Sequence, residues 1–241
     1  MPGTRAYTYV DAGNARAGSP WMERSWSAFL GNTVSLLDRA RGREWLEQPS
    51  QEIGLTADGE TLDLMAFQGG NWSEECNPYG AVLECRLTGE ALTLFARSTA
   101  MHDSPGMLRE LRLLNRSRRA LTVTGVVLDR LELALPAGRR ESFRRVSDTA
   151  IAASDGTEAL LVGHGADVAV EVNAERAPIL TLRCRTDFEL APGQVWRLPD
   201  TYVLPYTGPF EQVSGREYAS FLRAVRDLRA WEKDASNPGK S

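Results

Sequence analysis

Apolar and polar residues alternate with a period of two along most of the chain, which is typical of β-strands with one buried face. Segments 81–87 (AVLECRL) and 91–97 (ALTLFAR) flank a three-residue connection and predict a β-hairpin. Segment 107–114 (MLRELRLL) alternates in the same way. Residues 121–135 form a longer run rich in β-branched residues, in which Gly125 predicts a β-bulge.

Further short segments carry the same signals, and turn pairs such as Asp155-Gly156 separate several of them. These predicted strands cover residues 24–30, 33–38, 43–46, 51–55, 61–65, 158–163, 166–172, 178–184, 187–190, 194–198 and 201–204. The connections are short and contain no helical segment, which favours antiparallel pairing over β-α-β units. We therefore expect an all-β fold with two large antiparallel sheets packed face to face.

The C-terminal segment has a different period. Its apolar residues recur with the spacing of one helical face; they are Tyr218, Phe221, Leu222, Val225, Leu228 and Trp231. Ser214 and Glu217 match a capping box, so the spacing predicts an α-helix over about 214–233 with its N-cap at Ser214. No linker or repeat divides the chain, and we expect a single domain spanning 1–241.

The composition adds little to this picture. Of 241 residues, 42% are hydrophobic and 25% charged, which is ordinary for a globular protein, and the net charge is −4. The basic clusters 116–119, 139–140 and 144–145 lie at predicted turns or strand ends, so they do not indicate a nucleic-acid partner. Neither a secretory signal nor an apolar run long enough for a membrane span is recognisable, and we expect a cytoplasmic protein.

The remaining motifs exclude several kinds of site. Cys76, Cys85 and Cys184 are odd in number and widely spaced, which indicates neither a disulfide framework nor a zinc site. In a cytoplasmic protein the Asn-x-Ser triplets at Asn71 and Asn115 are chance matches. Phosphate-binding, nucleotide-binding and metalloprotease motifs are lacking, so we expect no cofactor and no metal.

Two long stretches resemble a known family. The stretch ALTLFARSTAMHDSPGMLRELRLLNRSRRALTVTGVVLDRLEL and the later WRLPDTYVLPYTGPFEQVSGREYASFLRAVRDL are similar to the N-terminal β-supersandwich domain of family-36 glycoside hydrolases, the α-galactosidase family. The resemblance implies a galactose-mutarotase-like supersandwich with a C-terminal α-helix. It also implies that the catalytic barrel, which follows this domain in that family, is not part of the sequence. The family's Asp-Phe-Arg loop is matched here by Asn71-Trp72-Ser73, which keeps the aromatic residue and loses both charges.

The stretch QGGNWSEECNPYG, residues 68–80, reads as a polar loop. Trp72 is a candidate platform for the apolar face of a sugar, or it folds back and caps the sheet edge. Glu74 and Glu75 are neighbours, so their side chains diverge in extended chain and they form a poor acid and nucleophile pair. They are solvated charges, or one of them binds a sugar hydroxyl.

Two histidines raise the alternative of an aldose 1-epimerase. His102 lies in a turn beside Asp103, and His164 lies at a glycine-flanked hairpin tip, where solvent exposure is expected. A histidine near a carboxylate can act as a general acid or base, but neither segment resembles the mutarotase histidine motifs. Arg109 is either part of a ligand site or an exposed charge paired across the strands.

If the 67–80 loop and the 100–106 turn share an edge, one patch would gather the candidate sugar-binding residues. They are Trp72, Glu74, Glu75, Asn77, Tyr79, His102, Asp103 and Arg109. The sequence thus predicts a carbohydrate-binding or accessory domain without recognised catalytic residues, whose partners are a sugar or oligosaccharide and a separate catalytic chain or a homo-oligomer. The alternatives are the epimerase and a structural or oligomerisation domain without a ligand.

Overall fold

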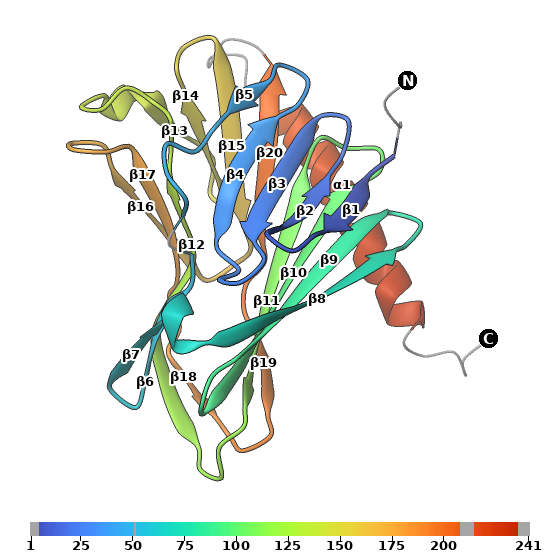
Figure 1. Ribbon diagram of the computed structural model, residues 1–241. Coiled ribbons are helices and arrows are strands. Elements are labelled where there is room, and N and C mark those ends of the chain that lie inside the picture. Colours follow the sequence, from blue (N-terminus) through green and yellow to red (C-terminus); the bar gives the residue numbers. More distant parts are fainter. Residues whose placement is uncertain (1–4, 51, 208–214, 236–241) are drawn as a thin grey trace.

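The structure is a computed structural model that describes residues 5–50, 52–207 and 215–235. Within these ranges the chain forms three antiparallel sheets, one α-helix and two short 3₁₀ helices, η1 (Leu64–Ala66) and η2 (Arg140–Ser142). Figure 1 shows the sheets stacked in layers, with the helix at the C-terminal end of the described chain. The expected all-β supersandwich with a C-terminal helix is confirmed.

The largest layer, here called the large sheet, has nine strands among the described residues. Its order is β13 (Phe143–Ser147), β14 (Ala150–Ser154), β15 (Glu158–His164), β20 (Thr201–Thr207), β11 (Met107–Asn115), β10 (Leu92–Met101), β9 (Gly80–Thr88) and β8 (Gln68–Cys76), and β19 (Val195–Arg197) extends the line of β20 along β11. The predicted hairpin is present, because β9 and β10 pair along their whole length.

Two smaller sheets complete the described fold. The second sheet has the order β16 (Val168–Asn173), β17 (Ile179–Cys184), β12 (Leu121–Glu132), β6 (Gly54–Ala57) and β7 (Glu60–Asp63), with β18 (Phe188–Leu190) also on β12. The N-terminal sheet runs in chain order through β1 (Tyr7–Val10), β2 (Asn14–Gly18), β3 (Met22–Ser27), β4 (Thr33–Asp38) and β5 (Arg43–Glu44). The side facing the large sheet is therefore divided between two sheets where one was expected, because a period of two identifies strands but not the sheet that each one joins.

The predicted bulge in β12 is confirmed. The pairing of β12 with β6 shifts register between Thr124 and Val127, and Gly125 between them has φ +61°. A residue with a Cβ atom rarely adopts this conformation, so glycine lets the long strand bend there.

The large sheet has two different faces. The inner face contacts the other two sheets and carries apolar residues such as Leu94, Leu111 and Val203, which belong to one core with residues of all three sheets. On the outer face, Leu108, Leu161 and other apolar residues form a second cluster with residues of the helix. Alternation along β10 and β11 places charged side chains on the rest of the outer face.

The helix α1 (Gly215–Ala235) packs on this outer face. Its residues Tyr218, Phe221, Val225 and Leu228 are buried, as their spacing predicts. The ring of Phe221 lies so close to Gly106 that an added Cβ atom there would come within 2.3 Å of it. The expected N-cap, Ser214, lies outside the described residues. No helix of the described chain is long and apolar enough to cross a bilayer.

Several strands were not predicted. β1, β2, β13 and β14 are short or rich in polar residues, and β8 covers most of the stretch expected to be a loop. β8 is an edge strand with mainly exposed side chains, so its sequence lacks the apolar alternation that marks buried strands. The loop assignment of residues 68–76 was therefore wrong, and only the Asn77–Gly80 turn that follows is irregular.

Asp155, in the turn between β14 and β15, gives a test of this part of the fold. Partial burial tends to raise its pKa, but hydrogen bonds from the backbone N–H groups of Thr157 and Glu158 and an ion pair with Arg43 outweigh this and lower it. The carboxylate thus contributes stability above the ordinary aspartate pKa of about 4, and this contribution is lost as the pH falls towards its lowered value. We expect Asp155→Asn to reduce the unfolding free energy at pH 7 and by less at pH 3. Urea denaturation at both pH values measures this, and an equal loss at both would contradict it.

Candidate functional site

Trp72 lies on the inner side of β8. Its indole N–H donates a hydrogen bond to the carbonyl of Ala28 at 2.9 Å, and its ring lies 6.2 Å from that of Trp26. The half-buried side chain thus closes the gap between the edge of the large sheet and the N-terminal sheet. This is the folded-back alternative of the sequence analysis, in which Trp72 caps the sheet edge.

The neighbouring residues divide between the two faces. Glu74 and Glu75 are exposed and point to opposite sides of β8, because they pair with Leu83 and Val82 respectively. The buried amide of Asn77 accepts hydrogen bonds from the backbone N–H groups of Tyr79 and the following Gly80, at 2.9 Å each. Asn77 therefore fixes the turn from β8 to β9, and only Glu75 and Tyr79 lie towards the outer face, beside α1.

His102 has both ring nitrogens engaged in local contacts. Nδ1 accepts a hydrogen bond from the backbone N–H of Ala6 at 3.2 Å, so Nε2 carries the proton and donates to the carbonyl of Asn77 at 3.1 Å. The adjacent Asp103 is exposed. His102 therefore ties the N-terminal strand region to the β8–β9 turn.

His164 is far from His102. The expected solvent exposure of His164 was wrong, since it is only 6% exposed and its Nδ1 lies 2.8 Å from the carbonyl of Gly165. The strand register places it level with Ser98 of β10, three strands away. His102 lies four positions beyond Ser98, just after β10. The two histidines are therefore about 14 Å apart along the strands and about 14 Å apart across them.

Arg109 points into the interior, where its side chain is 2% exposed. It forms ion pairs with Glu52 at 2.6 Å and Asp129 at 3.5 Å, and Arg24 pairs with the same two carboxylates. These four residues are here called the interior cluster. The cluster has equal numbers of positive and negative charges, and Thr33 also donates to Glu52.

Both expectations for Arg109 were wrong. Arg109 is neither an exposed charge on a strand nor part of a surface patch, because its side chain is buried in the interior cluster. Burial disfavours the charge of Arg24, but Asp129 and Glu52 outweigh that effect and raise its pKa. The eight candidate residues therefore do not share one patch, because successive side chains of each strand point to opposite faces of the large sheet.

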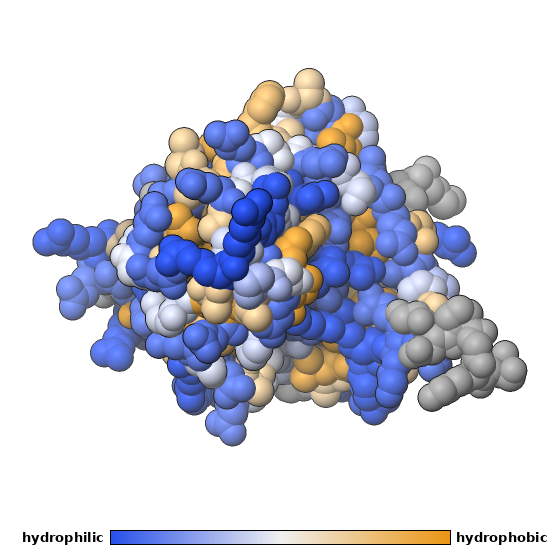
Figure 2. Space-filling model, turned by 90° about the horizontal axis from the view of Figure 1, so that it is seen from below, coloured by the Kyte–Doolittle hydropathy of each residue, from blue (hydrophilic) through white to orange (hydrophobic). Residues whose placement is uncertain are grey.

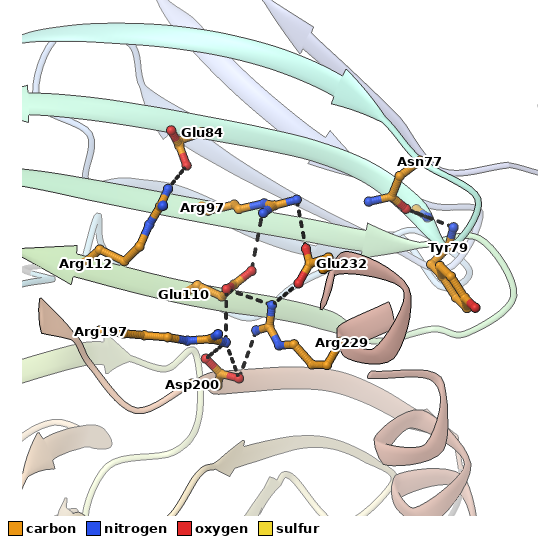
Figure 3. Close-up of polar contacts among 11 residues, drawn as sticks. Asn77, Tyr79, Glu84, Arg97, Glu110, Arg112, Arg197, Asp200, Arg229 and Glu232 are labelled. Carbon is orange, nitrogen blue, oxygen red and sulfur yellow. Dashed lines mark hydrogen bonds and ion pairs between the residues drawn. The ribbon is translucent and has the colours of Figure 1, made fainter. Parts of the chain in front are cut away.

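A cleft of about 770 Å³ lies on the outer face of the large sheet, beside the C-terminal turns of α1. Its centre is Glu110 of β11, which is 6% exposed. Three guanidinium groups surround this carboxylate: those of Arg229 at 2.8 Å, Arg197 at 3.1 Å and Arg97 at 3.9 Å (Figure 3). We call this the outer cleft; its lining is Glu75, Arg97, Glu110, Arg112, Arg197, Asp200, Arg229, Trp231, Glu232, Lys233 and Ala235.

Further ion pairs hold the outer cleft together. Asp200 binds Arg197 at 3.1 Å and Arg229 at 2.9 Å, and Glu232 of α1 binds Arg97 at 3.0 Å. Burial disfavours the charge of Arg229, but Glu110 and Asp200 outweigh this and raise its pKa. Strands β10, β11 and β19 and the residue before β20, Asp200, thus fix one wall of the cleft, and the end of α1 fixes the other.

An aromatic pair lies at one end of the outer cleft. The ring of Trp231 lies 6.3 Å from that of Tyr79, at the β8–β9 turn, and both side chains are half-buried. At the other side Arg197 remains 49% exposed and Arg112, paired with Glu84, is 37% exposed. The cleft therefore presents an aromatic surface next to planar groups that donate and accept hydrogen bonds in fixed positions.

Most residues of the outer cleft were not selected from the sequence. The alternation in 107–114 placed Glu110 and Arg112 on the face of Leu108, which was a usable signal. Asp200 and Arg229 come from segments far along the chain, and no local pattern links them to Glu110. Among the described residues, no group of three or more His, Cys, Asp or Glu side chains is arranged to hold a metal ion.

Comparison with known proteins identifies the fold. No protein-family model matches the sequence, and no curated protein matches it at a significant level. Among solved structures, a family-36 α-galactosidase from Geobacillus stearothermophilus superimposes with a TM-score of 0.57 and 10% identity, over 84% of this chain and 41% of that chain. A polysaccharide lyase gives a TM-score of 0.56 and 11% identity, over 83% and 33%. A heparan sulfate lyase from Pedobacter heparinus gives 0.53 and 12%, over 86% and 37%.

The chain thus spans about two fifths or less of the length of each of these proteins. At such low identity the likeness establishes the fold and not a shared activity. The described chain has the β-supersandwich fold that also occurs in family-36 α-galactosidases, as its sequence predicted.

Proposed function

We propose that this chain is a carbohydrate-binding domain and that its ligand occupies the outer cleft. The observation that carries the proposal is the arrangement of Trp231 beside the ion-paired groups around Glu110. An aromatic ring packs on the apolar C–H face of a sugar, and fixed guanidinium and carboxylate groups bind its hydroxyls. Because the ion pairs already hold these groups in place, little side-chain entropy is lost when a ligand binds.

Binding suits this cleft better than hydrolysis does. Glycoside hydrolysis requires one carboxyl group to donate a proton and another to act as base or nucleophile. Each acidic residue of the central network, Glu110, Asp200 and Glu232, already faces at least one guanidinium group. We therefore assign the chain an accessory role, in which a separate catalytic chain or domain acts on the bound carbohydrate. The named activities of the structural neighbours, on galactosides and polysaccharides, are consistent with this role.

The two alternatives have less support. An epimerase with His102 and His164 as partners would need both imidazoles in one cavity, and the strand register separates them. A purely structural domain would be favoured by a broad apolar face. Figure 2 shows hydrophobic residues interspersed with hydrophilic ones on the face seen from below.

Calorimetric titration with a panel of mono- and oligosaccharides tests the proposal. We expect heat of binding with at least one sugar, and about a tenfold or greater loss of affinity in Trp231→Ala, since the aromatic contact is removed. Trp72→Ala is the matched control, because this tryptophan lies on the other face of the sheet and should leave the affinity unchanged. Absence of heat with every sugar would refute the proposal, and a loss confined to Trp72→Ala would move the ligand to the sheet edge.

A further inference from the structure

The outer cleft continues along β10 into a row of three side chains. Phe95 of β10 lies between Arg86 of β9 and Arg112 of β11, which are its direct neighbours across the strands. The guanidinium carbons lie 5.8 Å and 5.3 Å from the centre of the Phe95 ring. Arg112 also lines the outer cleft, so the row and the cleft share a residue.

The next row towards α1 consists of charged residues. Arg97 pairs across the sheet with Glu84 on one side and with Glu110 on the other. Carboxylates and a guanidinium group therefore alternate in this second row, and the ion pair between Arg112 and Glu84 links it to the row of Phe95 (Figure 3). Such groups bind hydroxyls of successive sugar rings as readily as those of one ring.

The strand register gives the length of this surface. Glu75, beside Trp231 in the outer cleft, pairs with Val82, which is level with Thr99 of β10. Gly80, at the end of the β8–β9 turn, pairs with Met101 of β10. Phe95 lies four to six positions before these residues, a distance of about 14 to 20 Å at the rise of a β-strand. One six-membered sugar ring, with bonds of about 1.5 Å, cannot reach both ends.

We propose that the ligand is a linear oligosaccharide that lies along β10, with one end on Trp231 and the other on the Arg86–Phe95–Arg112 row. This inference rests on the proposed carbohydrate-binding function and specifies the length and direction of its ligand. The Phe95 row is a distal subsite that short sugars do not reach, and the ion pairs around Glu110 contact the middle of the chain.

A length series tests the inference. Gluco-, galacto- and manno-oligosaccharides of one, two, four and six units are titrated calorimetrically against the wild type and Phe95→Ala. We expect affinity to rise about tenfold or more between two and four units and to change little beyond. Phe95→Ala should remove this rise and leave disaccharide affinity unchanged, whereas Trp231→Ala should weaken both. Arg86→Gln should act like Phe95→Ala, and because Arg86 is exposed it leaves the fold intact.

Phe29→Ala is the control, since Phe29 is exposed in the turn between β3 and β4 and touches neither row. Equal affinity for one and four units, with no effect of Phe95→Ala or Arg86→Gln, would overturn the inference and leave a single-sugar site, with the proposed function intact. No binding to any sugar in the series by the wild type would reject the proposed function and this inference together.

Discussion

Replacing Arg109 by methionine is expected to lower the free energy of unfolding by about 3 to 5 kcal/mol. Arg109 is one of two cations in the interior cluster, and its removal leaves Glu52 and Asp129 with Arg24 as their only cationic partner in that cluster. The apolar side chain fills much of the space but leaves one buried negative charge uncompensated. Urea denaturation followed by circular dichroism measures the loss.

Two further variants make this test specific. Arg183→Met removes an arginine whose partner Glu171 is exposed at the surface, and its cost should stay below about 1 kcal/mol. The double variant Arg109→Met with Glu52→Gln restores equal charges in the cluster and should recover part of the stability. A loss below about 1 kcal/mol for Arg109→Met alone would show that the interior tolerates the unpaired charge and would contradict the expectation.

Replacing Phe221 by alanine is the second substitution with a large expected effect, again about 3 to 5 kcal/mol. Phe221 is fully buried and packs edge-to-face on Tyr202, with ring centres 5.5 Å apart. Gly106, which has no side chain, lies directly against the ring, so it cannot fill the space that the substitution leaves. The substitution therefore weakens the packing of α1 on the outer face of the large sheet.

This variant also tests how the helix serves the outer cleft. Arg229, Trp231 and Glu232 lie on the last turns of the same helix. If Phe221 holds the helix in place, Phe221→Ala should weaken sugar binding as well as stability, although it does not line the cleft. Arg223→Ala, on the exposed side of α1, should change neither property. Unchanged binding by a folded Phe221→Ala protein would show that the ion pairs to Glu110 and Asp200 hold the helix end without it.

The parts of the fold that follow from local chemistry could be predicted from the sequence. The β9–β10 hairpin is set by alternation and a short turn, and α1 is set by the period of its apolar residues. Gly125 marked its bulge because residues with a Cβ atom rarely adopt its left-handed conformation. The edge strand β8 could not be recognised, because its side chains are mainly exposed and its composition is that of a loop.

The site depended on side-chain direction and on long-range pairing. The sequence predicted that residues near the β8–β9 turn would gather with Arg109, but the pleat of the sheet sends Trp72 and Arg109 inward and Glu75 outward. Apart from its place in the alternation of 107–114, Arg109 has no sequence feature that distinguishes it from Arg112, three positions later. One is buried with two carboxylates and the other lines the outer cleft, because odd and even positions of one strand point to opposite faces.

The sequence by itself determined most of the strands and the helix, since these depend on the period of apolar residues and on turn chemistry within a few positions, and the supersandwich class followed from its resemblance to family-36 glycoside hydrolases. The tertiary structure alone decided which charges meet. Glu110 is joined to Arg229 and Arg197, and Arg109 to Glu52 and Asp129, only after distant segments pack together. An isolated charge is too costly to bury, so these pairs form only where the fold supplies a partner, and local sequence carries no record of that partner.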